Sequence, residues 1–181
     1  MRHVVILFVW MVVYSSKGYA EPSVDTHSQV VQKLGPTEVS AAMLSFGGYT
    51  LDGQSLSWDD LVHKDKTIIV SYFATWCQPC RTTMPVLESI AKQDSSVQVV
   101  YIALGEKSAL PVQKMVQELG IHSPVVLDKY EAIGKRHGVV RPDTTTQLPI
   151  TFVVTPEGIV KTIFTKEGSD FAQRVQQEIA K

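Results

Sequence analysis

Apolar residues fall into short blocks along the chain, and their spacing predicts alternating strands and helices. Continuous apolar runs, typical of buried strands, occur at 67–73, 97–104 and 124–127. Apolar residues at helical spacing occur at 78–92, 108–119, 129–137 and 169–180. Two hairpins are predicted, at 45–56 around Asp52-Gly53 and at 150–165 around Pro156-Glu157-Gly158, and a helix start is predicted at Ser57. Strands that alternate with helices and end in an antiparallel hairpin predict an α/β fold, with a mixed central sheet flanked by helices.

The first apolar block is of a different kind and predicts a signal peptide. Arg2 and His3 precede the apolar run 4–14, and small residues follow up to Ala20. We expect residues 1–20 to be a secretory signal that is cleaved after Ala20. The run is short for a membrane span, which needs about 20 apolar residues. An uncleaved membrane anchor is the alternative.

The rest of the chain is predicted to be one domain behind a polar leader. Residues 21–40 are mixed and polar and are assigned as leader or linker, and residues 41–181 as the domain. The segment 1–20 carries two basic and no acidic residues, so the mature chain has a net charge of about −3. Nucleic-acid binding normally needs a clustered basic face, so no nucleic-acid partner is expected.

The only two cysteines lie in the phrase Trp76-Cys77-Gln78-Pro79-Cys80, between a buried strand and a helical pattern. A strand that leads directly into a helix places Cys77 at the helix N-terminus, where unpaired N–H groups stabilise a thiolate. The spacing lets Cys80 reach Cys77 and form a disulfide. We therefore predict a redox-active dithiol in which Cys77 attacks and exposes its sulfur, and Cys80 resolves.

Two other interpretations of this motif are weaker. A structural zinc site needs four ligands, and the five histidines lack metal-ligand spacing; they are His3, His27, His63, His122 and His137. A purely structural disulfide that closes so short a loop adds little stability. No metal and no cofactor is expected.

Several separated motifs together resemble the thioredoxin superfamily, most of all its extracytoplasmic TlpA/ResA-like branch. The matching segments are Asp52-Gly53, the stretch 69–81 around the cysteines, Pro85, Gly105-Glu106, Gly138-Val139, 148–152 and Glu157-Gly158. The resemblance covers about residues 44–180. It implies a thioredoxin fold with an N-terminal β-hairpin extension and a central β-α insertion at about 106–137.

The resemblance also implies the residues that receive a substrate. It implies that Pro149 follows a cis peptide bond and packs against the cysteine pair, which the sequence alone does not establish. The backbone of Leu148 would then pair with an extended substrate segment. Trp76 would shape the surface beside Cys77. The simpler interpretation of Pro149 is a proline at the start of a strand.

The chain departs from the family pattern at three places. Ser71 stands where thioredoxins have a buried Asp, and Thr83 where many ResA-like proteins have a Glu. No carboxylate is then expected to relay the proton of Cys80, although both hydroxyls could simply pack or bind backbone groups. The loop 139–148 is longer than usual, and is either a recognition loop beside the site or a tolerated insertion.

The sequence thus predicts an extracytoplasmic thiol-disulfide oxidoreductase, periplasmic or secreted, that acts on protein thiols and disulfides. We expect a reductase, because Gln78-Pro79 places no charge between the cysteines. We also expect that a membrane thiol donor keeps it reduced and that the protein is a monomer. A thiol oxidase of the same fold is one alternative. A copper chaperone that uses both cysteines and His137 is another, and a non-catalytic binding module is a third.

Overall fold

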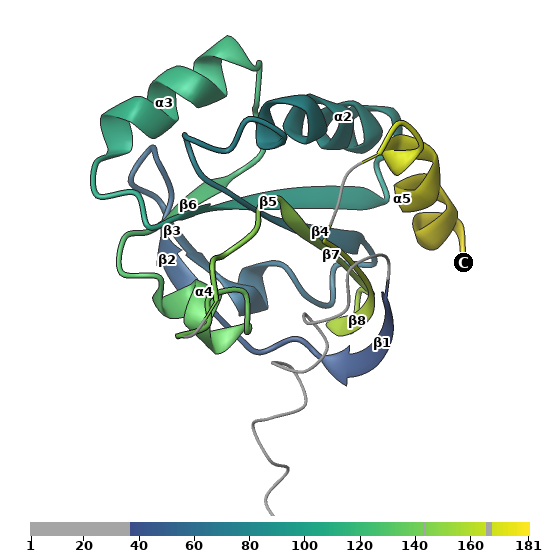
Figure 1. Ribbon diagram of the computed structural model, residues 1–181. Helices are drawn as coiled ribbons and strands as arrows, with labels where there is room; N and C mark the ends of the chain where they lie inside the picture. Colours follow the sequence, from purple (N-terminus) through teal and green to yellow (C-terminus); the bar gives the residue numbers. More distant parts are fainter. Residues whose placement is uncertain (1–36, 143, 166–167) are drawn as a thin grey trace, which may run out of the picture.

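A six-stranded mixed sheet forms the middle of the molecule in the computed structural model, which describes residues 37–142, 144–165 and 168–181 (Figure 1). In their spatial order the strands are β1 (Thr37–Ala42), β8 (Ile159–Phe164), β7 (Ile150–Val154), β4 (Thr67–Phe73), β5 (Val97–Leu104) and β6 (Val125–Asp128). The sheet confirms the predicted mixed α/β architecture. The predicted signal segment 1–20 lies outside the described residues.

The direction of the strands places the loops that follow β4 and β5 side by side. β4, β5 and β6 are parallel, and Phe73 at the end of β4 pairs with Ala103 of β5. β7 runs antiparallel to β4, with Ile150 opposite Tyr72. The chain therefore enters β7 at the same edge of the sheet at which it leaves β4 and β5.

Helices and a small hairpin cover the two faces of the sheet (Figure 1). On one face lie α2 (Cys80–Gln93), α3 (Ala109–Glu118) and α5 (Phe171–Ala180). On the other lie α4 (Ala132–Arg136), the single 3-10 turn η1 (Trp58–Asp60), and the hairpin of β2 (Gly47–Tyr49) and β3 (Ser55–Ser57). The predicted N-terminal hairpin and the predicted insertion, which contributes α3, β6 and α4, are both present.

Alternation along β4 divides the interior into two cores. The cysteine-side core packs under α2, α3 and α5 and includes Ile69, Phe73, Cys77, Cys80, Met84 and Tyr101. The histidine-side core packs on the opposite face and includes Phe46, Val70, Tyr72, Ile133 and Phe152. Successive side chains of a strand point to opposite faces, and both faces of this strand are covered, so its residues are continuously apolar.

Three predicted boundaries differ from the structure. β1 begins at Thr37, so residues 37–40, which we assigned to the linker, belong to a strand on the otherwise open edge of β8, and Thr37 and Glu38 pair with Ile163 and Thr162. α4 begins at Ala132, because Glu131 has a left-handed backbone with φ of 58°. The helix predicted at Ser57 is only one turn, and His63 with φ of 58° lies just beyond it. The Asp60 carboxylate accepts hydrogen bonds from the N–H and hydroxyl of Ser57, as expected for a helix start.

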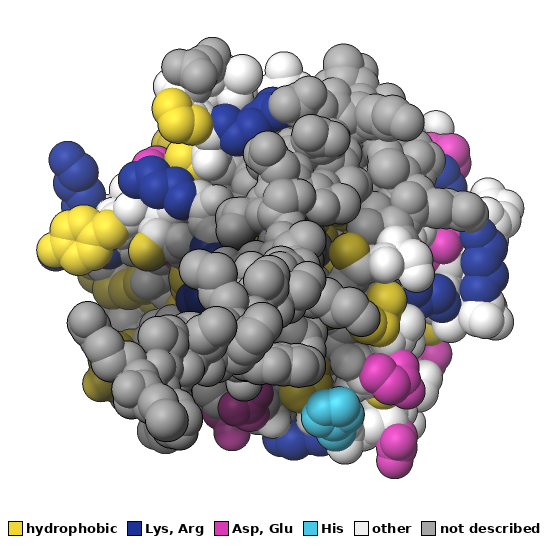
Figure 2. Space-filling view, turned by 90° about the horizontal axis from the view of Figure 1, so that it is seen from below, with side chains coloured by type: hydrophobic (Ala, Val, Ile, Leu, Met, Phe, Trp, Pro, Cys, Tyr) yellow, Lys and Arg dark blue, Asp and Glu magenta, His cyan; other side chains and the backbone are white. Residues whose placement is uncertain are grey.

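The side chains visible on the face of Figure 2 carry charges of both signs. Both basic and acidic groups of the described residues are visible around the part that is not described. The full chain has 17 basic and 18 acidic residues, so its charges nearly balance. This distribution agrees with a solvated surface and offers no single-sign field for a polyanion on the described part of this face.

Candidate functional site: a disulfide at the start of a helix

The two cysteines form a disulfide at the point where the central strand gives way to a helix. Cys77 lies in the loop after β4, and Cys80 is the first residue of α2. Their Cα atoms are 5.4 Å apart, within the usual range for a disulfide. The strand-to-helix placement predicted from the sequence is confirmed.

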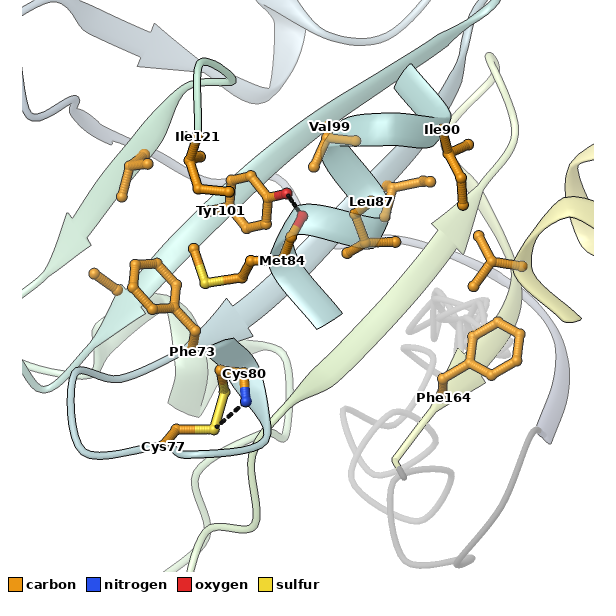
Figure 3. Close-up of a cluster of buried hydrophobic side chains, with 14 of the residues drawn as sticks. Phe73, Cys77, Cys80, Met84, Leu87, Ile90, Val99, Tyr101, Ile121 and Phe164 are labelled. Atoms are coloured by element: carbon orange, nitrogen blue, oxygen red, sulfur yellow. Dashed lines mark hydrogen bonds between the residues drawn. A yellow bond between two sulfur atoms is a disulfide. The ribbon is translucent and has the colours of Figure 1, made fainter. Parts of the chain in front are cut away.

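The helix donates a hydrogen bond to the first sulfur. The Cys80 N–H donates to Cys77 Sγ over 3.2 Å (Figure 3). This N–H belongs to the first turn of α2, where backbone donors have no partner inside the helix. Pro79 precedes it with φ of −60°, suited to a helix start, and has no N–H of its own. The local backbone thus supplies a donor and the positive end of a helix dipole to Cys77.

Both sulfurs face the protein interior. Cys77 exposes 2% of its surface and Cys80 none, and both belong to the cysteine-side core with Phe73 and Met84 (Figure 3). The prediction that the Cys77 sulfur is exposed is therefore wrong for the disulfide form. The disulfide holds the two sulfurs together, and the apolar residues around them cover both.

The other predicted site residues converge on the same edge of the sheet. Trp76 precedes Cys77 and is 68% exposed. The Leu148–Pro149 peptide bond is cis, as the resemblance implied. Pro149 is buried, and the half-buried Leu148 packs against both the cysteine-side core and the histidine-side core. Because Ile150 is opposite Tyr72, Leu148 and Pro149 continue past the end of the β4–β7 ladder toward the cysteine loop.

The two positions without a carboxylate carry partnered hydroxyls. Ser71 and Thr151 lie on the neighbouring strands β4 and β7, and their hydroxyl oxygens are 3.1 Å apart. The Thr83 hydroxyl donates to the Cys80 carbonyl over 3.3 Å. All three residues are buried. Thr83 thus binds a backbone group, as the simpler interpretation held, and Ser71 binds a neighbouring side chain.

His137 lies on the other side of the sheet from the cysteines. Its Nε2 is 2.7 Å from the Leu44 carbonyl oxygen, which can only accept, so Nε2 carries a proton, and in the neutral ring Nδ1 accepts from the Tyr72 hydroxyl. Burial raises the pKa of Tyr72 well above its ordinary value, and the charge of Asp128 adds to this. The backbone N–H of His137 closes α4, as predicted, but its ring packs among Phe46, Tyr72 and Phe152.

This placement removes the third ligand from the copper alternative. Cys77 and Cys80 belong to the cysteine-side core, whereas the ring of His137 contacts the histidine-side core. Within the described ranges, no group of three or more His, Cys, Asp and Glu residues is arranged to hold a metal ion. The arrangement fits thiol chemistry better than metal transfer.

One residue of the site was not predicted. The Glu106 carboxylate accepts a hydrogen bond from the Thr75 N–H over 2.6 Å. Glu106 follows β5, and Gly105 turns the chain there with φ of 70°. Gly105-Glu106 was part of the family pattern, but nothing in the sequence showed that this side chain reaches the loop before Cys77. The contact depends on the two parallel strands ending together.

The described hollows of the surface lie away from the cysteines. One, of about 450 Å³, is lined by the β2–β3 turn and residues 121–125. Another, of about 620 Å³, is lined by the C-terminal half of α2 and by Leu119, Gly120, His122 and Ser123. Neither is lined by Cys77 or Cys80. The disulfide site is therefore separate from both hollows.

A disulfide that opens the helix after the central strand, with a cis-proline at the start of the adjacent antiparallel strand, defines a protein of the thioredoxin-like fold. A family model supports this assignment. Residues 39–163, more than half of the chain, match the AhpC/TSA family, and the chain belongs to that family.

Sequence relatives and solved structures agree with the assignment. The thiol-disulfide oxidoreductase ResA of Bacillus subtilis is 30% identical over 116 residues, 63% of this chain and 60% of ResA. The ResA of Geobacillus thermodenitrificans is 29% identical over 105 residues, 57% of this chain and 56% of that protein. The chain thus spans less than two thirds of these relatives.

Two solved structures share the fold over most of the chain. A thioredoxin family thiol:disulfide interchange protein of Chlorobium tepidum has a TM-score of 0.62 and 29% identity, covering 79% of this chain and 97% of its own. A secreted thiol-disulfide isomerase of Corynebacterium glutamicum has a TM-score of 0.70, covering 82% and 91%. At 18% identity, the second likeness concerns the fold alone.

Proposed function

We propose that the protein is an extracytoplasmic thiol-disulfide oxidoreductase that exchanges its Cys77–Cys80 pair with cysteines of protein substrates, acting as a reductase. One observation carries the proposal: the Cys80 N–H at the start of α2 donates to Cys77 Sγ. The same donor can stabilise a thiolate at Cys77 once the disulfide is reduced. Relatives that are named thiol-disulfide oxidoreductases agree with this chemistry.

The reaction has two steps. The Cys77 thiolate attacks one sulfur of a substrate disulfide, forms a mixed disulfide and releases the other substrate sulfur as a thiolate. The Cys80 sulfur, as a thiolate, then attacks Cys77 Sγ, closes the Cys77–Cys80 disulfide and releases the second substrate sulfur. Two electrons pass from the dithiol to the substrate, and its thiolates take up protons from solvent. A second thiol donor must then reduce the disulfide again.

Three residues are proposed to bind the substrate around this reaction. Trp76 offers an exposed aromatic surface next to Cys77. Leu148 and Pro149 lie beyond the end of the β4–β7 ladder, so an extended substrate segment could pair with the Leu148 backbone as an added strand. The longer loop 139–148 stays a candidate for recognition.

The proposed setting is the periplasm or the cell exterior, and the N-terminal segment is either a signal that is cleaved off or an anchor that stays attached through the leader. The residues that would form this segment lie outside the described part. Among the described helices, none combines the length and the apolar character that spanning a membrane requires. A membrane thiol donor that reduces the disulfide again, and a monomeric state, belong to the same proposal.

A trapping experiment tests the proposal. Cys80→Ala should accumulate a mixed disulfide between Cys77 and substrate, whereas Cys77→Ala should form none and lose insulin reduction. Trapping by Cys77→Ala would reverse the assigned roles. The equilibrium of the Cys77–Cys80 couple with glutathione decides the direction, because a couple near −120 mV would indicate an oxidase and one near −270 mV a reductase.

A further inference from the structure

We propose that Glu106 is a positioning residue that holds the turn before Cys77 and whose negative charge favours the disulfide over the dithiol, which biases the protein toward reducing its substrates. This inference rests on the proposed function. It begins from the hydrogen bond between Glu106 and Thr75, which neither strand pairing nor helix formation requires.

The Thr75 N–H is a donor that the sheet leaves unused. β4 ends at Phe73, and the next residues form a turn in which the Cys77 N–H donates to the Ala74 carbonyl over 3.0 Å. Thr75 lies inside this turn. Its N–H donates to Glu106 Oε1 over 2.6 Å, a short distance typical of a charge-assisted bond. Glu106 therefore fixes the segment that sets the position of Cys77.

The backbone around Glu106 is shaped to deliver the carboxylate. β5 ends at Leu104, and Gly105 then takes φ of 70°, a conformation that favours glycine. A Cβ at Gly105 would also lie 3.1 Å from Glu131 Oε1, so this position is crowded as well as left-handed. The Gly105 N–H donates to the Asp128 carbonyl over 3.0 Å, which ties the turn to β6. Glu106 is thus placed by three strands.

The position of this charge matters because the two redox states differ in charge. The disulfide is neutral, whereas the reduced pair carries a thiolate when Cys77 ionises. The Glu106 carboxylate is bound to the N–H two residues before Cys77, so it repels the thiolate, leaves the neutral disulfide unaffected and makes electron donation more favourable. The α2 donor at 3.2 Å acts in the opposite sense and contacts the sulfur directly. Glu106 offsets part of that stabilisation, and its half-buried position reduces the screening by water.

Among the described residues, Glu106 is the carboxylate that accepts a hydrogen bond from the loop before Cys77. Ser71 and Thr83 offer only hydroxyls at the positions where relatives of this fold were expected to carry acids. Glu118 pairs with Arg81 at the start of α2, so its charge is compensated. Glu106 is therefore the acidic side chain through which the described part of the chain can tune the couple.

Two substitutions separate charge from position. Glu106→Gln keeps an oxygen that can accept from Thr75 but removes the charge, and Glu106→Ala removes both. Glu88→Gln is the matched control: Glu88 is also half-buried and accepts backbone N–H groups, from His122 and Ser123, but lies two helical turns beyond Cys80. Each variant is made in the full chain.

The equilibrium with reduced and oxidised glutathione measures the effect of the charge. We expect Glu106→Gln to lower the equilibrium constant for the disulfide by about three- to tenfold, as a partly screened charge near the sulfur would. Glu88→Gln should change it by less than twofold. An unchanged equilibrium in Glu106→Gln would overturn the role of the charge.

Amide hydrogen exchange of Thr75 measures the effect on position. We expect the amide to stay protected in Glu106→Gln and to exchange at least tenfold faster in Glu106→Ala. Equal protection in all variants would overturn the positioning role. Neither readout needs a substrate, so failure of the parent chain to reduce insulin would count against the proposed function and leave both results interpretable.

Discussion

The two faces of the central sheet are both covered by apolar cores, yet they bury different polar groups. On the cysteine side the buried polar side chains include the hydroxyls of Ser71, Thr83 and Thr151. On the histidine side they include the imidazole of His137 and the carboxyl group of Asp128. Among the described residues, the buried imidazole and the buried carboxyl group therefore lie on the face of the sheet opposite the disulfide.

This difference separates a chemical face from a structural one. His137 joins Tyr72 of β4 to the Leu44 carbonyl before β2. The Asp128 carboxylate accepts from the Gly134 N–H over 2.8 Å and so holds α4 against β6. The hydroxyls beside the cysteines are weak acids and bases, so the protons of the dithiol should pass to water or to substrate. Substitutions on the two faces should then affect stability and redox chemistry separately.

His137→Ala is expected to give the largest difference between an effect on stability and an effect on redox chemistry. It removes a buried ring from among Phe46, Tyr72 and Phe152 and leaves the Leu44 carbonyl without this donor. Loss of packing and of hydrogen bonds should lower the free energy of unfolding by about 3 kcal/mol, measured by urea titration. The glutathione equilibrium of Cys77–Cys80 should stay within twofold of the parent. A large shift would show that the two faces are coupled.

The strands and the redox motif were predictable because their signals are local. Strand β5 matches its predicted bounds, since its apolar run is buried on both faces. The Cys77–Cys80 disulfide follows from spacing and from the strand-to-helix junction. The cis bond before Pro149 came from family resemblance, because the sequence alone carries no such signal.

The contacts that were missed all join segments far apart in the chain. Glu106 meets Thr75 only because β4 and β5 are parallel neighbours. His137 was predicted as a helix end, and it is one, but the burial of its ring depends on the hairpin covering that face. The burial of Cys77 depends on the packing of the cysteine-side core. The periodicity of apolar residues predicts on which face of a strand or helix a side chain lies, but it does not predict which distant residue that side chain contacts.

Placing an acid on the cysteine side should remove this difference between the two faces. Thr83 is buried and binds the Cys80 carbonyl, so Thr83→Glu should destabilise the fold by about 2 kcal/mol. Burial should also raise the pKa of the introduced carboxyl toward neutrality, which suits proton transfer. We expect release of substrate by Cys80 to become roughly three- to tenfold faster at pH 7, with a flatter dependence on pH.

The rate is followed by stopped-flow fluorescence of Trp76 between pH 6 and pH 9. Thr83→Gln is the control, because the Gln side chain has nearly the same shape as the Glu side chain and cannot take up the proton of Cys80. If Thr83→Glu and the parent show the same pH profile, another group already accepts the proton of Cys80. The absence of a carboxylate at Ser71 and Thr83 would then have no functional consequence.

Among the described residues, each face of the sheet buries one tyrosine, and the pair gives a matched test of alkaline stability. Burial raises the pKa of Tyr72, aided by Asp128, and that of Tyr101, aided by Glu88. Above about pH 10 the unfolded chain loses these protons while the folded chain keeps them, so stability falls as pH rises, by about 1.4 kcal/mol per unit for each tyrosine.

Tyr72→Phe and Tyr101→Phe should each remove one such contribution and make the decline shallower. At pH 7, Tyr72→Phe should lower the free energy of unfolding by about 1–2 kcal/mol, because the His137 ring loses its hydrogen bond to the Tyr72 hydroxyl. Tyr101→Phe should lower it by about 1 kcal/mol, because the Met84 carbonyl loses the Tyr101 hydroxyl as a donor. Urea titrations from pH 7 to pH 11 check both. Equal slopes in parent and variants would mean that the hydroxyls also ionise in the folded protein.

The smallest effect is expected from Ser71→Ala, which asks whether the hydroxyl pair on the cysteine side takes part in the chemistry. Ser71 Oγ lies 3.1 Å from Thr151 Oγ1, so its removal should cost about 1 kcal/mol of stability. Thr151→Val should cost a similar amount, and the double variant should cost less than the sum, because both single changes remove the same bond. Since hydroxyls are poor proton acceptors, the rate at which Cys80 resolves the mixed disulfide should stay within twofold of the parent from pH 6 to pH 9. A rate that falls more than tenfold in Ser71→Ala and not in Thr151→Val would make Ser71 a proton relay, and the cysteine side would then have its own acid–base group after all.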